Sequence, residues 1–278
     1  VSEIAIDPKN PNILYAASHQ RRRQEWTYIG GGPESTIYKS IDGGQNWINI
    51  YGAATATVAN NIVYIQDIVA WNNPTTNQTE VFFGCDAMYY SEEVTQASGG
   101  TASYTYLGSN AIGLYRCTDG VNFARIDQAS LKNASNRFYA PNKFTIGSDG
   151  KLWMGSKYNY IYGTAGGMVF STTNGATWTN VRNLGNNGRV EIVASKQTPN
   201  KLYVLLQNRS GAGDLAQFAV TTDGFATAPT FRTIPDDVDT GIAANDFTRG
   251  QNFYDLLLGI DPNNDDTLII GGIDLFRT

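Results

Sequence analysis

Acidic side chains in the predicted loops are the residues of this sequence best able to do chemistry. Two carboxyl groups that lie roughly 5 to 10 Å apart across a cleft can cleave a glycosidic bond by general acid and base catalysis. Asp255, in the segment Asn252-Phe253-Tyr254-Asp255, is the catalytic candidate that we select, because it closes a long connection just before a predicted innermost strand. The other acids on the same side of the predicted fold are Glu25, Glu34, Asp86, Glu92, Glu93, Asp214, Asp236, Asp237, Asp239 and Asp246.

The sequence contains one histidine, His19, which restricts the remaining chemistry. A Ser-His-Asp triad, a Cys-His pair or a metal site with several histidines would have to be built around this residue. The segment 261–265 has the oxygen spacing of a calcium loop but lacks the glycine and the glutamate that such a loop needs, so we expect a plain turn. We expect neither a metal ion nor a cofactor.

Two cysteines, Cys85 and Cys117, lie in segments with the pattern of strands. A cysteine pair in a chain of low charge is consistent with one disulfide formed in an oxidising compartment, and two buried free thiols explain it as well. The sequence leaves both possibilities open.

The charge of the chain excludes some partners. Lys and Arg number 20 and Asp and Glu 25, so the net charge is -5 and no general attraction to nucleic acid or anionic lipid is expected. No stretch approaches the roughly 18 apolar residues that a membrane-spanning helix needs. The sequence begins with Val1 and shows neither a signal peptide nor a targeting tail, so we expect a portion of a longer protein.

An internal repeat organises the chain. Residues 37–47 read Ile-Tyr-Lys-Ser-Ile-Asp-Gly-Gly-Gln-Asn-Trp, a strand followed by a turn, and segments 114–123, 169–178 and 219–225 have the same shape. In such a turn the aspartate accepts backbone N–H bonds, a glycine adopts positive φ and the tryptophan packs under the turn. We therefore predict a structural role for Ser40, Asp42, Gly44, Trp47, Asp119, Ser171, Gly175, Trp178 and Asp223, with Cys117 in the serine position and Thr173 in an aspartate position.

A second hairpin precedes each of these turns. Each unit is therefore predicted as four strands, A to D, with the repeated turn between strands C and D. This repeat and its turn-rich connections are typical of propeller blades. We predict an all-β fold, a β-propeller of four-stranded antiparallel blades, incomplete in this chain at about four and a half blades. The predicted blades are 1–52, 62–127, 142–184, 188–235 and an incomplete 253–278.

The repeated turns are Asp boxes, and the chain resembles the BNR-repeat β-propellers, which include sialidases, two-propeller xyloglucanases and sortilin-type receptors. Segments 14–47 and 252–278 are similar to repeats of large secreted bacterial proteins of the type IX secretion kind, often labelled glycosyl hydrolase by repeat alone. The resemblance implies a propeller that is secreted or displayed on the cell surface. It leaves function open, because members of the family do different things.

Strand alternation predicts where a site would lie. The A–B and C–D turns fall at one end of each blade, and the B–C loops and the connections between blades fall at the other. Long loops at one end of a rigid scaffold are where binding residues usually lie. The binding candidates in those loops are Trp26, Tyr28, Tyr89, Tyr90, Tyr158, Tyr160 and Tyr254, with Tyr104, Tyr106 and Tyr162 close by.

These aromatic side chains suit stacking on sugar faces, a protein interface, or packing of the loops against one another. A sialidase is not expected, because the consecutive residues Arg21, Arg22 and Arg23 point to opposite sides of an extended segment and cannot converge on one carboxylate. We predict a module that recognises a glycan or a protein partner, with a glycoside hydrolase acting on a polysaccharide as the alternative. The rest of the propeller is expected from flanking sequence or another chain.

Overall fold

The computed structural model describes residues 3–18, 21–24, 27–30, 35–52, 64–86, 88–91, 104–107, 111–160, 162–209, 215–234 and 246–278. Contacts divide the chain into two compact units, which we describe separately. Unit 1 consists of residues 1–141 and 159–164, and unit 2 of residues 142–158 and 165–278.

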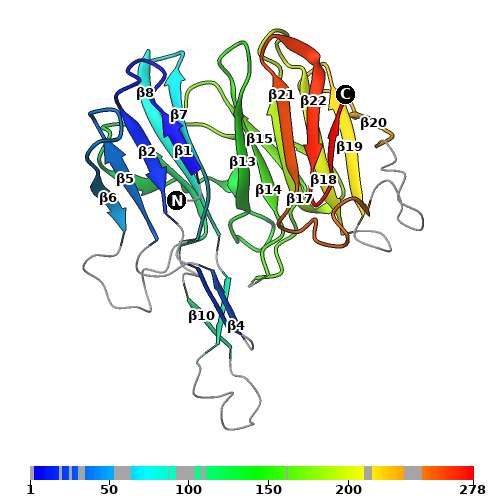
Figure 1. Ribbon diagram of the computed structural model, residues 1–278, viewed down its shortest axis with the longest axis horizontal. Helices are drawn as coiled ribbons and strands as arrows, with labels where there is room; N and C mark the ends of the chain where they lie inside the picture. Colours follow the sequence, from blue (N-terminus) through cyan, green and yellow to red (C-terminus); the bar gives the residue numbers. More distant parts are fainter. Residues whose placement is uncertain are drawn as a thin grey trace. The chain divides into compact units, whose positions relative to one another are not determined.

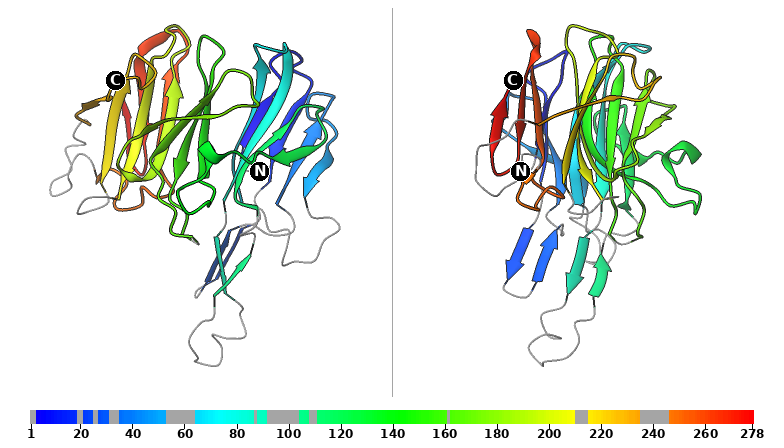
Figure 2. Two further views of the ribbon diagram at one scale, coloured as in Figure 1. Left: turned by 180° about the vertical axis from the view of Figure 1, so that it is seen from behind. Right: turned by 90° about the vertical axis from the view of Figure 1, so that its right-hand side faces the viewer.

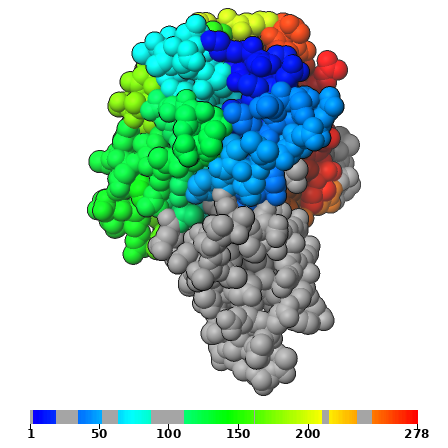
Figure 3. All heavy atoms as spheres, turned by 90° about the vertical axis from the view of Figure 1, so that its left-hand side faces the viewer, coloured from blue at the N-terminus to red at the C-terminus, as the bar shows by residue number. Residues whose placement is uncertain are grey.

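Unit 1 contains two four-stranded antiparallel sheets (Figure 1). Sheet 1 has the order β1 (Glu3–Ile6), β2 (Leu14–Ala17), β5 (Thr36–Ser40) and β6 (Ile48–Gly52). Sheet 2 consists of β7 (Tyr64–Asn73), β8 (Gln78–Asp86), β11 (Gly113–Cys117) and β12 (Phe123–Arg125). The two sheets share one apolar core, and their residues form a closely packed surface in Figure 3.

Unit 2 holds most of sheet 3 and all of sheets 4 and 5. Sheet 3 is β13 (Ala140–Ile146), β14 (Leu152–Lys157), β15 (Met168–Thr172) and β16 (Thr179–Asn183). Sheet 4 is β17 (Asn187–Ala194), β18 (Leu202–Asn208), β19 (Ala216–Thr221) and β20 (Thr230–Arg232). Sheet 5 has three strands, β21 (Leu257–Asp261), β22 (Asn264–Gly271) and β23 (Leu275–Arg277).

The second strand of a sheet is the most deeply buried. All six residues of β14 are buried, as are the first six of β18, Leu-Tyr-Val-Leu-Leu-Gln. A strand covered on both faces shows a continuous apolar run instead of alternation, which the β18 sequence has. The apolar clusters between sheets 3 and 4 and between sheets 4 and 5 form the core of unit 2.

The antiparallel order gives each sheet two different ends. We call the end with the A–B and C–D turns the turn face, and the end with the B–C connection and the link to the next sheet the loop face. The B–C connections of sheets 1 and 2 contain hairpins that the sequence did not predict, β3 (Arg21–Gln24) with β4 (Thr27–Gly30), and β9 (Met88–Ser91) with β10 (Tyr104–Leu107). Strands β4 and β9 are neighbours, and the hairpins lie side by side beyond the loop face of unit 1 (Figure 2).

The four C–D turns share one hydrogen-bond pattern. In the first turn the Ser40 hydroxyl donates to Asp42 Oδ1 at 2.8 Å, and the backbone N–H groups of Gln45 and Asn46 donate to the same oxygen at 3.0 and 2.9 Å. Hydrogen bonds from the Asn46 backbone and side chain lower the pKa of Asp42 to about 2. The equivalent pairs in the other turns are Cys117 with Asp119, Thr172 with Asn174, and Thr221 with Asp223.

The third turn corrects the predicted register by one residue. Thr172, not Ser171, supplies the hydroxyl, which accepts the Gly175 N–H at 2.9 Å. Asn174, not Thr173, accepts the N–H groups of Ala176 and Thr177, at 3.0 and 2.8 Å. The prediction was wrong because the third turn has one residue fewer than the first between its hydroxyl residue and its tryptophan, so alignment on the tryptophan shifted the start. An amide oxygen thus replaces the carboxylate in this turn.

Trp47 and Trp178 lie in different surroundings. The Trp47 indole is 37% exposed and donates a hydrogen bond to the Gly44 carbonyl, so it covers its own turn from the outside. Trp178 is fully buried.

Cys85 and Cys117 are both buried free thiols, so a disulfide between them, one of the two possibilities from the sequence, is wrong. Strands β8 and β11 pair with Cys85 opposite Gly113 and Cys117 opposite Val81. The two cysteines are therefore four register positions apart, roughly 13 Å along the strands at about 3.3 Å per residue. A disulfide requires Cα atoms within about 7 Å.

Candidate functional site

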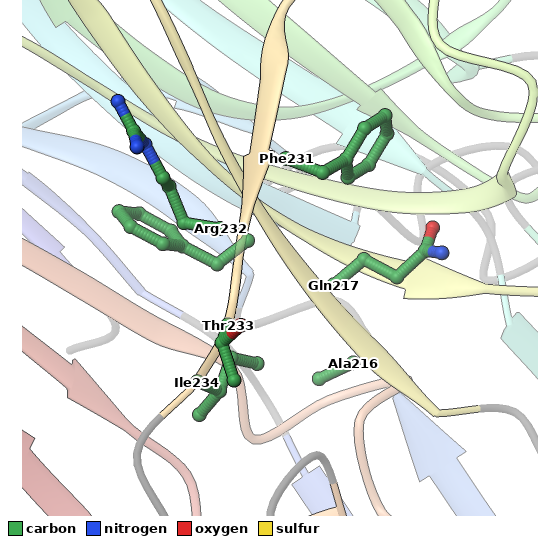
Figure 4. Close-up of a pocket in the computed structure, with 7 residues that line it drawn as sticks. Ala216, Gln217, Phe231, Arg232, Thr233 and Ile234 are labelled. Atoms are coloured by element: carbon green, nitrogen blue, oxygen red, sulfur yellow. The ribbon is translucent and has the colours of Figure 1, made fainter.

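A pocket of about 390 Å³ lies at the loop face of sheet 4 (Figure 4). It is formed where β19 begins and β20 ends, and its lining residues are Ala216, Gln217, Phe218, Phe231, Arg232, Thr233 and Ile234. The volume is in the range of about 300 to 1,000 Å³ that ligand sites usually have.

The β19–β20 register distributes the pocket side chains over two faces. Phe231 pairs with Ala219 and lies on the same face as Gln217, whereas Arg232 pairs with Phe218 on the opposite face. Figure 4 shows Phe231 and Gln217 on one side of the strand and Arg232 on the other. The Phe231 ring is 52% exposed. An exposed ring next to an amide and a hydroxyl can stack on a flat ligand and bond its hydroxyl groups.

The apolar floor of the pocket continues into the segment that precedes sheet 5. Ala216, Phe218 and Ile234 belong to the same core cluster as Phe247 and Leu256. Ala216 and Phe218 lie on the Arg232 face, so it is this face of the pocket, opposite Phe231, that packs on residues 246–256, the second part of the candidate site.

Segment 246–256 places two aromatic rings outward. Successive turns are closed by hydrogen bonds from Arg249 N–H to Asp246 O, from Gln251 to Thr248 and from Tyr254 to Gln251. Phe253 and Tyr254 are 42% and 54% exposed, and their rings meet edge to face with centroids 4.6 Å apart. The Tyr254 hydroxyl donates to the Gln251 side chain, which fixes the ring.

Asp255 faces inward, unlike its two aromatic neighbours. Both carboxyl oxygens are buried and have no hydrogen-bond partner among the described residues. Burial raises the pKa of the Asp255 carboxyl, and the Arg189 guanidinium opposes this shift.

A hydrogen-bonded chain holds Arg189 next to this carboxyl. Arg189 Nε donates to Glu191 Oε1 at 2.7 Å, and an Nη atom of Arg189 lies 3.5 Å from the Leu256 carbonyl oxygen. The Asn142 side chain donates to the same Glu191 oxygen at 2.8 Å and to the Val190 carbonyl at 2.9 Å. The network therefore links β13 and β17 to Leu256, the residue that precedes β21.

The remaining predicted binding residues are dispersed. Tyr158 stacks under the Arg209 guanidinium, 3.8 Å from its ring centre, and Tyr160 is half-buried. Tyr28 lies on β4 and Tyr89 and Tyr90 on β9, where the structure describes the backbone. Trp26 lies outside the described residues.

The sequence analysis missed Phe231, Gln217 and Phe253. The signal that points to Phe231 is its place at the end of a D strand, just before the long connection 236–253. Phe231 lies on a strand, outside the tyrosine-rich loops from which the binding candidates were chosen.

Comparisons with known proteins show the fold. No family model matches the chain, and no curated protein matches it. The GH74 enzyme of Niastella koreensis matches with a TM-score of 0.59 at 16% identity, over 99% of this chain and 44% of that one. The GH74 xyloglucanase of Xanthomonas campestris has a TM-score of 0.55 at 15% identity, over 100% of this chain and 44% of that one.

An ancestral GH74 enzyme matches with a TM-score of 0.56 at 16% identity, over 99% of this chain and 33% of that one. The chain thus spans less than half the length of these three structures. Together with the antiparallel sheets of this chain, they confirm the predicted all-β propeller fold. Among the residues that the structure describes, no helix is long and apolar enough to cross a membrane.

Proposed function

We propose that this chain recognises a glycan through the loop face of unit 2. The observation that carries the proposal is the pocket in which the exposed Phe231 ring lies beside Gln217 and Thr233. A sugar ring offers an apolar face of C–H groups and a rim of hydroxyl groups, which match an aromatic ring and neighbouring amide and hydroxyl groups.

The aromatic pair supports the same function. Phe253 and Tyr254 are exposed on the segment whose Leu256 shares a core cluster with the pocket floor. An extended oligosaccharide can contact several aromatic rings, and Phe253 and Tyr254 offer a second contact. In unit 1, the neighbouring strands β4 and β9 bring the positions of Tyr28, Tyr89 and Tyr90 to one region of the loop face.

The geometry supports recognition better than hydrolysis. Among the described residues that line the pocket there is no carboxylate. Asp255 turns its oxygens away from solvent, and Glu191 is buried and paired with Arg189. A hydrolase needs two accessible carboxyl groups on either side of the scissile bond.

Glycoside hydrolysis is the second candidate, and one observation favours it. A carboxyl whose pKa is raised by burial keeps its proton to higher pH and can then donate it to a leaving group, as Asp255 would. In this alternative, Asp255 is the general acid, and a second carboxyl group on the loop face activates the attacking water or acts as the nucleophile.

We also propose that the chain is a BNR-repeat propeller of a secreted or surface protein. The hydrogen bonds of the four C–D turns support the family, since a hydroxyl or thiol and an Asx side chain recur at the same two places. Composition supports the location, because charged residues make up only 16% of the chain and tyrosine is abundant.

A glycan array combined with calorimetry on soluble polysaccharides tests the proposal. We expect binding that Phe231→Ala and Tyr254→Ala each weaken at least tenfold, whereas Ile41→Ala, at an exposed position on the turn face, leaves it unchanged. Released reducing sugar, measured in the same samples and lost in Asp255→Asn, would establish the hydrolase instead. Absence of binding to every glycan overturns the proposal and leaves a protein partner.

A further inference from the structure

The segment 125–139, which runs from the end of β12 to the start of β13, crosses the loop face of unit 1. The Arg125 guanidinium carbon lies 4.5 Å from the centre of the Phe138 ring, and the Lys132 ammonium group lies 4.6 Å from the same centre. Attraction between a cation and the negative face of an aromatic ring limits the motion of both cationic side chains. Two positive charges are therefore held beside one ring.

A third cation is held on a second ring in the same way. The Arg137 guanidinium carbon lies 5.2 Å from the centre of the Tyr162 ring, and an Nη atom of Arg137 donates to the Tyr162 carbonyl oxygen at 2.8 Å. Phe138 and Tyr162 both pack against the small core cluster of Ile112 and Ala140. The two rings, and with them the three cations, are therefore gathered around one cluster.

Hydrogen bonds within the segment fix its backbone. Lys132 and Phe138 form an isolated antiparallel bridge. Between them, the Asn133 side-chain oxygen accepts the N–H groups of Ser135 and Arg137, both at 3.0 Å. A charge that is already held in place loses little conformational entropy when it binds a ligand. The segment therefore presents its cations in a form that is prepared to bind anions.

The local charge is opposite in sign to that of the whole chain. Segment 125–139 has a net charge of +2, because it contains one acid, Asp127, against three bases, Arg125, Lys132 and Arg137. The whole chain has a net charge of -5. Asp127 forms an ion pair with Lys132, so the positive charge of the segment is only partly neutralised within it. Such a concentration of one sign of charge attracts ligands of the opposite sign.

The polar surface of the segment favours an anionic glycan over an anionic peptide. Ala134, Ser135 and Asn136 are exposed between the cations Lys132 and Arg137. Among the described residues of the segment, no large apolar side chain is exposed. A protein interface is usually centred on buried aromatic or apolar anchors. Hydroxyl and amide groups beside cations instead match the hydroxyl and acidic groups of a sugar.

We propose that segment 125–139, together with Tyr162, binds the carboxylate or sulfate groups of an acidic polysaccharide. A guanidinium forms two parallel hydrogen bonds with either group, and a polymer of acidic sugars presents such groups repeatedly. This site belongs to unit 1 and is built from residues other than those of the unit 2 pocket, so the two can be tested separately.

Calorimetry of the whole chain with two matched pairs of polymers tests the proposal. Dextran sulfate is compared with dextran, and polygalacturonate with its methyl ester. We expect both acidic polymers to bind with a dissociation constant of about 1 to 100 μM in about 50 mM NaCl, and about tenfold more weakly in about 500 mM NaCl. The neutral polymers should show no such salt-dependent binding.

Substitutions locate the binding on this segment. Lys132→Gln and Arg137→Gln should each weaken binding of the acidic polymers about threefold, and the double variant about tenfold, because each removes one charged contact. Arg137→Lys keeps the charge and should retain most of the affinity. Lys9→Gln is the matched control, since Lys9 is exposed at the turn face of sheet 1 and should leave binding unchanged.

The outcomes separate this site from the pocket of unit 2. Phe231→Ala, which changes the pocket, should leave binding of the acidic polymers intact. Binding of neither acidic polymer, full affinity in the double variant, or equal affinity for poly-glutamate overturns the proposal. Far-UV circular dichroism of each variant verifies the fold.

Discussion

Arg189 and Glu191, two residues apart on β17, form an ion pair in which Nε lies 2.7 Å from Oε1. The positive charge of Arg189 therefore stabilises two carboxylates, that of Glu191 and that of Asp255. Arg189 lowers the pKa of Asp255 against the larger effect of burial. The pKa of Asp255 can therefore be changed by replacing either Arg189 or Glu191.

Replacing the partners should move the pKa of Asp255 in opposite directions. Arg189→Gln removes the stabilising cation and should raise this pKa further, whereas Glu191→Gln frees the guanidinium and should lower it. Carbon-13 NMR titration of labelled aspartate measures both. Shifts of the same sign in the two variants would contradict the assigned network.

The buried carboxyl should also make stability depend on pH. Because the pKa of Asp255 is raised on folding, the folded chain holds this proton longer than the unfolded chain. Stability should then fall as pH rises above the ordinary aspartate pKa of about 4. Asp255→Asn has no carboxyl group to ionise at this position, so it should not lose this stability. The difference in melting temperature between the variant and the parent should therefore grow, in favour of the variant, as pH rises from about 4 to 7. A constant difference across that range would exclude the effect.

The corrected register of the third turn can be tested by two neighbouring alanine substitutions. Thr172→Ala removes the oxygen that accepts the Gly175 N–H and should cost about 1 kcal/mol of unfolding free energy. Ser171→Ala should cost clearly less, because Ser171 is not the hydroxyl of the turn. Urea denaturation measures the unfolding free energy of both variants. A larger loss for Ser171→Ala than for Thr172→Ala would support the alignment predicted from the sequence, with Ser171 as the hydroxyl of the turn.

Close approach between sheets should make two glycines irreplaceable. Gly84→Ala and Gly155→Ala each place a methyl group 2.5 Å from a neighbouring strand and should destabilise the chain by about 1 to 3 kcal/mol. Gly259→Ala is the matched control, because its Cβ would meet nothing closer than 3.9 Å. Thermal melts of the three variants test this, and equal stabilities would refute the close packing.

The two thiols should be unreactive in the folded state. Burial raises the pKa of Cys117 to about 11 and that of Cys85 further, so little thiolate is present at neutral pH. A maleimide reagent should label both cysteines in denaturant and neither at an appreciable rate without it. Mass spectrometry that finds a linked peptide pair before reduction would disprove the free thiols.

Most of the architecture was predictable from the sequence, because alternating strands and glycine-rich turns are local signals. The inserted hairpins β3–β4 and β9–β10 were not, since their strands are four residues long and lie inside long loops. Asp255 was placed at the correct end of an innermost strand. The inward orientation of the Asp255 side chain depends on its surroundings, which include Arg189 of β17, and a local sequence pattern cannot predict such non-local contacts. Phe231 was missed because the face on which it lies is set by its pairing with Ala219, a contact between strands that the local sequence does not show.

The C–D turns have a consequence for how such a chain can change over generations. Each turn is closed by hydrogen bonds within a few consecutive residues, as Asp42 accepts from Ser40 and Asn46, and Asp223 from Thr221 and Thr227. A gene segment that runs from one turn to the next therefore encodes all the residues that form the hydrogen bonds of its turn. Duplication or deletion of that segment changes the number of sheets in whole steps and leaves no turn without its hydrogen bonds.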